Sequence, residues 1–253
     1  MLVVLCIGAF IGSTISGLIG MAGGSILLAV MLLAGLDPLT VVPIHAAVQL
    51  VSNSTRVYAF RQHFKVSCWA VLALAALPGP IVGLWCLQQL DAVTVKALMG
   101  VAIICAAWAP KKGLNRLSDR TAFGIAGALA GTLGVIVGAV GPLLAPFFLR
   151  GGFKKESIIG TKAGCQATIH IIKIAAFSGL YPMLLVGEHR DFDFLAQLPM
   201  IVPMALTTKV GTYTGKSMLR WVSEKRFILI YKVVLTVLGA RLLWDAWANF
   251  IPT

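Results

Sequence analysis

Charged residues are scarce in this sequence, and acidic residues are the scarcer kind. Only 12% of the 253 residues are charged, whereas 58% are hydrophobic. The charged share is about half that of an ordinary soluble domain, so the composition excludes an ordinary soluble fold. Because an apolar helical span takes about 20 residues, the chain has room for roughly eight to ten spans with short loops and for no separate soluble domain.

No acidic residue falls clearly inside a predicted span. All of them map to loops or segment ends: Asp37, Asp91, Asp119, Glu156, Glu188, Asp191, Asp193, Glu224 and Asp245. A proton relay or cation site built on buried carboxylates therefore has no candidate residues. The five cysteines lie in apolar runs without C-x-x-C spacing, which argues against both a disulfide framework and a metal site. No cofactor is expected.

The 21 lysines and arginines give the chain a formal net charge of +12. No basic helix or aromatic-basic module accompanies this charge, so nucleic acid is not an expected partner. The basic residues gather instead in every second connection, at residues 61–65, 111–120, 150–155 and 216–226. By the positive-inside rule these loops are cytoplasmic. We therefore expect a multi-pass protein of the cell (inner) membrane with both termini outward, whose first apolar run is a retained span and not a signal peptide.

Charges, glycine and proline clusters and turn formers divide the chain into ten apolar segments, five in each half. The segments are residues 2–20, 23–35, 40–61, 66–89, 93–110, 121–138, 141–150, 157–180, 192–215 and 226–249. We predict an all-α polytopic membrane fold. The second segment of each half is short, and residues 141–150 are too few to cross a bilayer at about 1.5 Å per residue. The first two segments of each half are therefore predicted to be broken helices, Gly-rich hairpins that meet near the bilayer midplane.

A pattern of polar residues in the first half recurs 117 positions later without a gap. Gln49, Asn53, Arg56 and Phe60 are matched, in order, by Gln166, His170, Lys173 and Phe177. Because each copy has an odd number of segments, the second copy is inverted in the membrane, as in many secondary transporters. We predict a first membrane repeat at residues 1–110, a cytoplasmic linker at 111–120 and a second, inverted membrane repeat at 121–253.

Each set of recurring residues falls on one face of its predicted helix, which we call a polar stripe. Lys173 lies in the middle of its segment, where a lysine is costly and usually faces a cavity. Arg56 lies later in its segment, so snorkelling to the cytoplasmic surface is an open alternative. His45 and Lys162 continue the stripes nearer to the segment starts, where we expect them to line a mouth or to be solvated. Two cations at equivalent positions predict an anion site shared by the halves.

The other stripe residues are hydrogen-bonding groups. Gln49 and Gln166 offer amide donors to anionic oxygens, with Asn53 and His170 beside them. The alternative is that these side chains join helices to one another, as polar residues in membranes often do.

Glycine-rich breaks precede both short segments and supply the rest of the candidate site. A helix that begins inside the membrane exposes unpaired N–H groups and the positive end of its dipole, which attract an anion. Pro142 suits the first turn of such a helix, and Ser25 would cap the other helix or donate to the substrate. The alternative is close helix packing, because both breaks contain G-x-x-x-G spacing. The candidate residues from the breaks are Gly23, Gly24, Ser25, Gly138, Ala139 and Gly141.

These breaks carry a resemblance to a known family. The stretch Gly17-Leu-Ile-Gly20-Met-Ala-Gly23-Gly24-Ser25 resembles the first glycine signature of the TauE/SafE family of membrane permeases, and Gly134-Val-Ile-Val-Gly138-Ala-Val-Gly141-Pro142 resembles a diverged second one. The usual glycine triplet is reduced to Gly23-Gly24 in the first copy and to Gly141 alone in the second. The resemblance covers nearly the whole chain and implies export of sulfite or of a small organosulfonate such as sulfoacetate.

We therefore expect a secondary transporter, not an enzyme, that exports a small anion by alternating access around a cationic site between the repeats. Its expected partners are that anion and the lipid bilayer, and a homodimer is left open. An anion channel for small oxyanions or carboxylates would use the same residues without alternating states. A membrane-embedded enzyme or assembly subunit would need a nucleophile-base pair or a metal cluster, and His45 and His170 have no carboxylate partner.

Overall fold

The computed structural model of the chain describes residues 1–20, 23–108, 117–138, 140–148, 153–180, 192–218 and 224–248, and the elements in these ranges are helices. They are α1 (Leu2–Ile19), α2 (Gly23–Leu33), α3 (Pro38–Ala59), the short 3-10 helix η1 (Arg61–His63), α4 (Val66–Ala76), α5 (Gly79–Gln88), α6 (Ala92–Trp108), α7 (Asp119–Val137), α8 (Gly141–Phe148), α9 (Lys155–Phe177), α11 (Leu198–Met218) and α12 (Glu224–Ala248). The predicted all-helical fold is confirmed.

Each predicted apolar segment contains a helix, and two segments differ from the prediction. Residues 66–89 form two helices, α4 and α5, which are bent by 44°. The bend lies at Pro78 and Pro80, which remove backbone donors from the helix and break its hydrogen-bond ladder. The segment predicted to begin at residue 192 becomes helical only at Leu198. The residues before it form a turn, in which Asp193 accepts a hydrogen bond from the backbone N–H of Ala196 at 3.0 Å.

The predicted breaks before both short helices are present. Helix α1 is followed by Gly20 with φ 69°, and α7 is followed by Gly138 with φ 76°. These left-handed values favour glycine, which has no Cβ to clash. Helix α2 then has 11 residues and α8 has 8. At about 1.5 Å per residue, neither helix reaches the ~30 Å of a hydrocarbon core. Broken helices are thus confirmed, while their depth in a bilayer stays a prediction.

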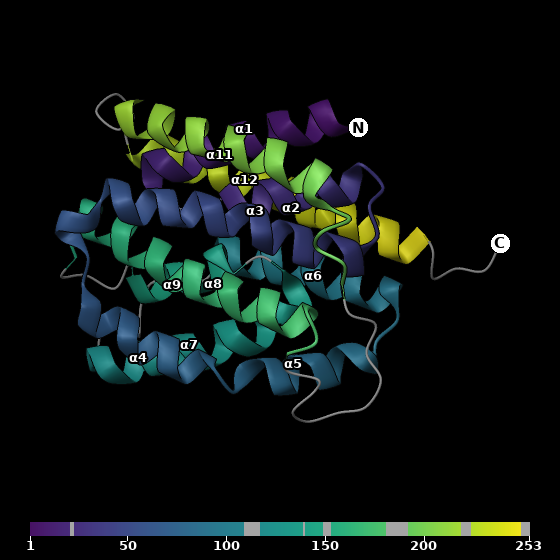
Figure 1. The fold of residues 1–253 in the computed structure, drawn as a ribbon, viewed down its shortest axis with the longest axis horizontal. Coiled ribbons are helices and arrows are strands. Elements are labelled where there is room, and N and C mark those ends of the chain that lie inside the picture. Colours follow the sequence, from purple (N-terminus) through teal and green to yellow (C-terminus); the bar gives the residue numbers. More distant parts are fainter. Residues whose placement is uncertain are drawn as a thin grey trace.

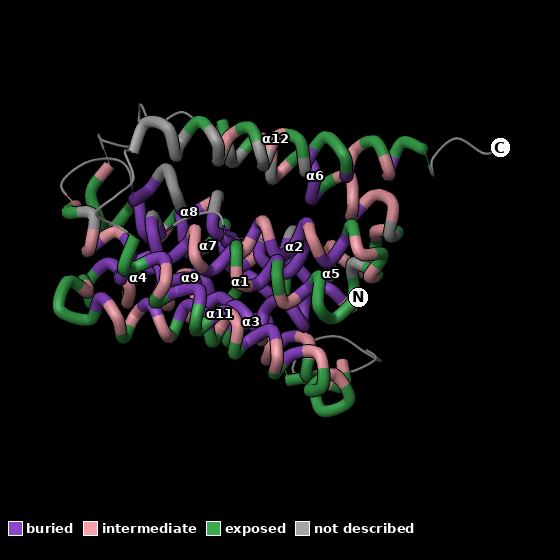
Figure 2. The backbone as a smooth tube through the Cα atoms, turned by 90° about the horizontal axis from the view of Figure 1, so that it is seen from above, coloured by how far each residue is buried: buried purple, intermediate pink, exposed green. Residues whose placement is uncertain are grey.

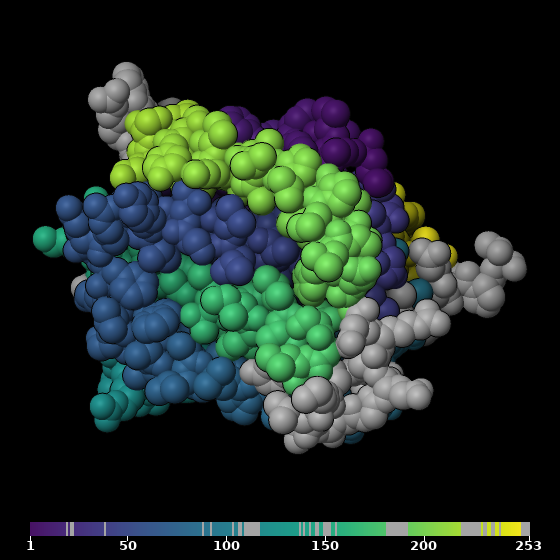
Figure 3. Space-filling view, in the orientation of Figure 1, coloured from purple at the N-terminus to yellow at the C-terminus, as the bar shows by residue number. Residues whose placement is uncertain are grey.

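The helices form a row in which neighbours pack side by side (Figure 1). Helix α1 packs on α11, α11 on α3, α3 on α9, α9 on α4, and both α4 and α5 on α7. Helices α6 and α12 pack on each other and form a further layer, which contacts α2 and α8 (Figure 2). Helices α3 and α9, which carry the two polar stripes, therefore occupy the centre of the row. Figure 3 shows them side by side, flanked by α11 and α4.

The outer helix pairs of the row pack through glycines. In the pair α1 and α11, a Cβ on Gly17 would overlap the carbonyl oxygen of Thr212. In the pair α4 and α7, a Cβ on Gly131 would overlap the carbonyl oxygen of Ala76. The backbones of these helices therefore touch, as is common where small residues form helix contacts in membranes.

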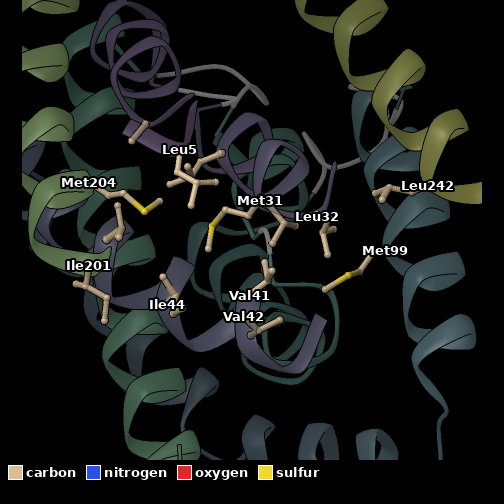
Figure 4. Close-up of a cluster of buried hydrophobic side chains, with 14 of the residues drawn as sticks. Leu5, Met31, Leu32, Val41, Val42, Ile44, Met99, Ile201, Met204 and Leu242 are labelled. Atoms are coloured by element: carbon tan, nitrogen blue, oxygen red, sulfur yellow. The ribbon is translucent and has the colours of Figure 1, made fainter. Parts of the chain in front are cut away.

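Two apolar clusters hold the broken helices against the centre of the row. The first joins α2 to its neighbours through Leu5 of α1, Met31 of α2, Val42 of α3, Met99 of α6 and Met204 of α11 (Figure 4). The second surrounds α8 and includes Phe123 of α7 and Phe148 of α8. Each short helix is thereby fixed beside a polar stripe by the packing of apolar side chains.

Large apolar side chains also cover the outside of the molecule. Leu74 in α4, Trp85 in α5, Leu206 in α11 and Val237 in α12 are each more than half exposed. By length and composition alone, no single helix among the described residues qualifies as a membrane span, and α4 and α5 qualify together as one bent pair.

The two ends of the bundle differ. The start of α1 and the end of α12 lie at one end, and the loop between α3 and α4 lies at the other (Figure 1). At that second end, Lys216 of α11 donates to the carbonyl oxygen of Ala59 at 2.9 Å. The last turns of α3 and α11 therefore lie together at that end, and the side of the membrane that this end faces stays a prediction.

The glycine contact between α4 and α7 gives a testable prediction. We expect Gly131→Ala to destabilise the protein by about 1–3 kcal/mol, because the new methyl group would overpack a backbone contact. Gly124→Ala is the matched control in the same helix, since the nearest atom to its Cβ is 4.0 Å away. The control should be neutral or stabilising by up to roughly 1 kcal/mol. Thermal unfolding in detergent measures both, and equal midpoints for the two variants would contradict this packing.

Candidate functional site

Helices α3 and α9 pack in antiparallel fashion, so the two polar stripes face each other. At one end of the contact, Phe60 after α3 packs on Gly160 near the start of α9. At the other end, His45 early in α3 lies beside His170 late in α9, with ring centroids 5.7 Å apart. His45 and Arg56 are about 16 Å apart along α3. The two polar stripes face each other over this length.

The middle of this contact is polar and buried. Gln49 and Gln166 are 3% and 6% exposed, and both histidines are 1% exposed. The Oε1 atom of Gln166 and the Nδ1 atoms of His45 and His170 have no hydrogen-bond partner. Because buried polar atoms are normally hydrogen-bonded, these atoms mark a place for a ligand or water.

The start of α2 contacts the stripe of α3. A Cβ on Gly24 would lie 3.5 Å from Nε2 of His45 and 3.6 Å from Oε1 of Gln49. His45 donates from Nε2 to the carbonyl oxygen of Gly24 at 2.8 Å. Gly24 therefore faces polar side chains of the candidate site and not the backbone of another helix.

Gly23 and Ser25 have different surroundings. The N–H of Gly23 donates to Oγ of Ser16 at 2.9 Å, and a Cβ on Gly23 would overlap the carbonyl oxygen of Gly12. Gly23 thus packs α2 against α1, and the serine that binds the first N–H of α2 is Ser16, not Ser25. The Oγ atom of Ser25 is buried without a partner, so it is available to a ligand.

The break before α8 is held by Lys173. Its Nζ donates to the carbonyl oxygen of Gly138 at 2.6 Å, at the C-terminal end of α7, where a cation is favourable. Gly141 begins α8, and a Cβ on it would lie 2.9 Å from Nε2 of Gln166. Pro142 occupies the first turn of α8, as predicted. Ala139 lies outside the described residues.

Arg56 and Lys162 are buried at the other end of the stripes, with exposures of 1% and 0%. The snorkelling alternative for Arg56 is therefore wrong, and so is the expectation that Lys162 and His45 are solvated. The antiparallel contact of α3 with α9 covers both ends of each stripe. Arg56 donates to Oδ1 of Asn53, whose Nδ2 donates to the carbonyl oxygen of Gln49 at 2.8 Å. Asn53 thus orients Arg56 within its own helix.

The cations of the stripes have no carboxylate partner in the described part of the chain. The Nε atom of Arg56 and the Nζ atom of Lys162 have no hydrogen-bond partner. Across the described ranges, no carboxylate forms an ion pair with these two residues or with Lys173, which is 0% exposed. Buried charges without a counter-charge are costly, so the arrangement favours a bound anion. In the same ranges, no group of three or more His, Cys, Asp or Glu residues is placed to hold a metal ion.

The positive groups form a row along the contact between α3 and α9, and His170 is within electrostatic range of both Arg56 and Lys173. Arg56 is also within electrostatic range of Lys162, toward one end of the row. Lys173 is also within range of His45, toward the other end. Lys162 and His45, which we expected to line a mouth or to be solvated, thus belong to the same buried row as Arg56 and Lys173, and the 117-residue offset pairs them with each other.

Comparison with known proteins gives one family. Residues 4–242 match the family described as sulfite exporter TauE/SafE. No curated protein and no solved structure gives a significant match. The family is one of membrane permeases that export sulfite or related anions, and the matched region is nearly the whole chain. This multi-pass membrane protein therefore belongs to the TauE/SafE family of sulfite exporters.

Proposed function

We propose that this protein exports sulfite or a small organosulfonate such as sulfoacetate across the inner membrane by alternating access. The observation that carries the proposal is the set of three buried cations, Arg56, Lys162 and Lys173, which lack a paired carboxylate in the described part of the chain. A small anion from water supplies the missing counter-charge. Membership of the TauE/SafE family supports a sulfur oxyanion as that anion.

The central binding position is proposed to lie between the starts of α2 and α8. Gln49 is beside Gly24, and Gln166 is beside Gly141, so each short helix begins next to an amide side chain. Amide N–H groups and helix N-termini both donate to anionic oxygens. The oxygens of a sulfite or sulfonate group point in several directions and can accept from both helices at once. The unpartnered hydroxyl of Ser25 adds a further donor.

The helix packing supports inverted repeats at residues 1–110 and 121–253, joined by the linker at 111–120. If the two halves correspond in order, the contact of α1 with α11 corresponds to that of α7 with α4 and α5. Likewise, the contact of α11 with α3 corresponds to that of α4 with α9. The breaks show the same correspondence between the halves. Gly20 packs on Ile159, and Gly138 packs on Val42. Val42 and Ile159 are related by the 117-residue offset.

Two equivalent ends suit alternating access. The anion is held near Arg56 and Lys162 when that end is open, and near Lys173 and His45 when the other end is open, and it passes the two glutamines between them. Lys173 exchanges its bond to the carbonyl oxygen of Gly138 for a bond to the arriving anion. Positive groups along the whole route keep the anion from being trapped at one end.

The unpaired cations predict a trade-off between stability and binding. In buffer without small oxyanions, Lys162→Met should raise the thermal midpoint, because it removes the desolvation penalty of an unpaired buried ion, which is on the order of several kcal/mol. Sulfite should then stabilise the variant less than it stabilises the wild-type protein. Lys173→Met is the matched control: it leaves the carbonyl oxygen of Gly138 unpaired, at a cost of about 1–3 kcal/mol, so its gain should be smaller. A lower midpoint for Lys162→Met, with the full response to sulfite, would contradict the site.

Counterflow in proteoliposomes tests the transport mechanism. Vesicles loaded with unlabelled sulfite should accumulate external labelled sulfite transiently and saturably, because a carrier exchanges its substrate between alternating states. Protein-free vesicles are the control. Flux without an overshoot and without saturation would indicate a channel. Competition by taurine as strong as that by sulfoacetate would contradict a strictly anionic substrate.

A further inference from the structure

A pocket of about 360 Å³ opens at the end of the bundle that carries the loop between α3 and α4. This volume is at the lower end of the range for ligand sites and admits a small oxyanion with some of its water. Its lining residues are Gln62, His63, Phe64, Lys65, Lys154 and Ser157. None of them is acidic, and the two lysines are exposed at the rim. The pocket is therefore a basic opening at the surface, separate from the buried polar contact of α3 and α9.

The N-terminus of α9 lines the pocket through Lys154 and Ser157, and it has unused hydrogen-bonding capacity. Lys154 precedes α9, and its side chain does not cap the helix. The first N–H groups of a helix have no partner within the helix, and they carry the positive end of its dipole. Ser157, in the first turn, is 5% exposed, and its Oγ has no hydrogen-bond partner. A buried hydroxyl without a partner in the lining of a basic pocket is a donor for an anionic oxygen.

Contacts with the loop fix the walls of the pocket. The backbone N–H of Lys65 donates to Oγ1 of Thr161 at 2.9 Å, which ties the loop to the second turn of α9. The Nζ atom of Lys65 lies 4.0 Å from the centroid of the Phe153 ring, so this ammonium group is held beside the start of α9. A preorganised cation loses less side-chain entropy on binding than a free surface lysine does.

The pocket lies next to the buried cations along the same helix. Ser157 and Thr161 are four residues apart on one face of α9, and Lys162 follows directly. Five residues of helix separate Ser157 from Lys162 by about 7.5 Å. The hydrogen bond from Lys65 to Thr161 ties the loop to α9 between these two residues.

We infer that this pocket is a docking site for a small sulfur oxyanion, which it holds before the anion reaches Arg56 and Lys162. The inference rests on the proposed export function and adds a second, outer binding site to it. Lys65 and Lys154 supply the charge, and Ser157 and the first turn of α9 supply hydrogen bonds. Movement of the loop at Thr161 then admits the anion to the inner pair.

Titration of purified variants with sulfite tests the docking site directly. In Lys162→Met protein the inner pair is broken, and we expect one weaker, salt-sensitive site to remain beside the binding at the glutamines and Lys173. Adding Lys65→Gln and Lys154→Gln should remove that site, because its charge is lost. Adding Lys96→Gln and Lys209→Gln is the matched control, which removes the same charge away from the pocket and should leave binding unchanged. A weaker, salt-sensitive site that survives Lys65→Gln with Lys154→Gln would overturn the inference.

Transport in the wild-type background provides a second readout that does not depend on Lys162→Met. Uptake from the pocket side should show an apparent KM raised roughly ten-fold by Lys65→Gln with Lys154→Gln, the lower end of the effect of focused charge on association. The control pair of substitutions should leave the KM unchanged. Equal KM values for both double variants would refute the docking site alone. Absence of saturable uptake by the wild-type protein would refute the proposed export, whereas sulfite binding at the pocket would still be seen in the titration.

Discussion

Buried positive charge that no described carboxylate pairs with is the constraint around which this structure is arranged. Arg56, Lys162 and Lys173 lie inside the contact of α3 with α9, where water is excluded and, in the described ranges, no carboxylate pairs with them. The surrounding parts reduce the cost: Asn53 accepts from Arg56, and the carbonyl oxygen at the end of α7 accepts from Lys173. These contacts use only some of the available donors. The donors that have no partner remain available to a bound anion.

The antiparallel arrangement of α3 and α9 explains why positive groups lie toward both ends of the contact. An arginine late in one helix is within electrostatic range of a lysine early in the other, and a lysine late in that helix is within range of a histidine early in the first. In the proposed mechanism these groups mark the two ends of one route, with the glutamines and the starts of α2 and α8 between them. The outer pocket extends this route to the surface on one side.

Much of this arrangement could be predicted from the sequence, because it depends on local patterns. The glycine breaks fix where α1 and α7 end, and the spacing of Gln49, Asn53 and Arg56 places them on one helix face. What could not be predicted depends on how distant segments pack. Burial of Arg56 and Lys162 follows from the contact of α9 with α3, which no local pattern reports. The structural role of Gly23 depends in the same way on Ser16 and Gly12 of another helix.

The most direct test of anion binding in the contact of α3 and α9 is to locate a heavier analogue of sulfite in the protein. Selenite has the same shape and charge type as sulfite, and its selenium atom gives an anomalous diffraction signal. We expect an anomalous peak inside the contact of α3 and α9, either within hydrogen-bonding distance of Gln49 or Gln166, between the starts of α2 and α8, or beside the cations at one end. Selenite found only on the outer surface, with the contact of α3 and α9 empty at saturating concentration, would contradict it.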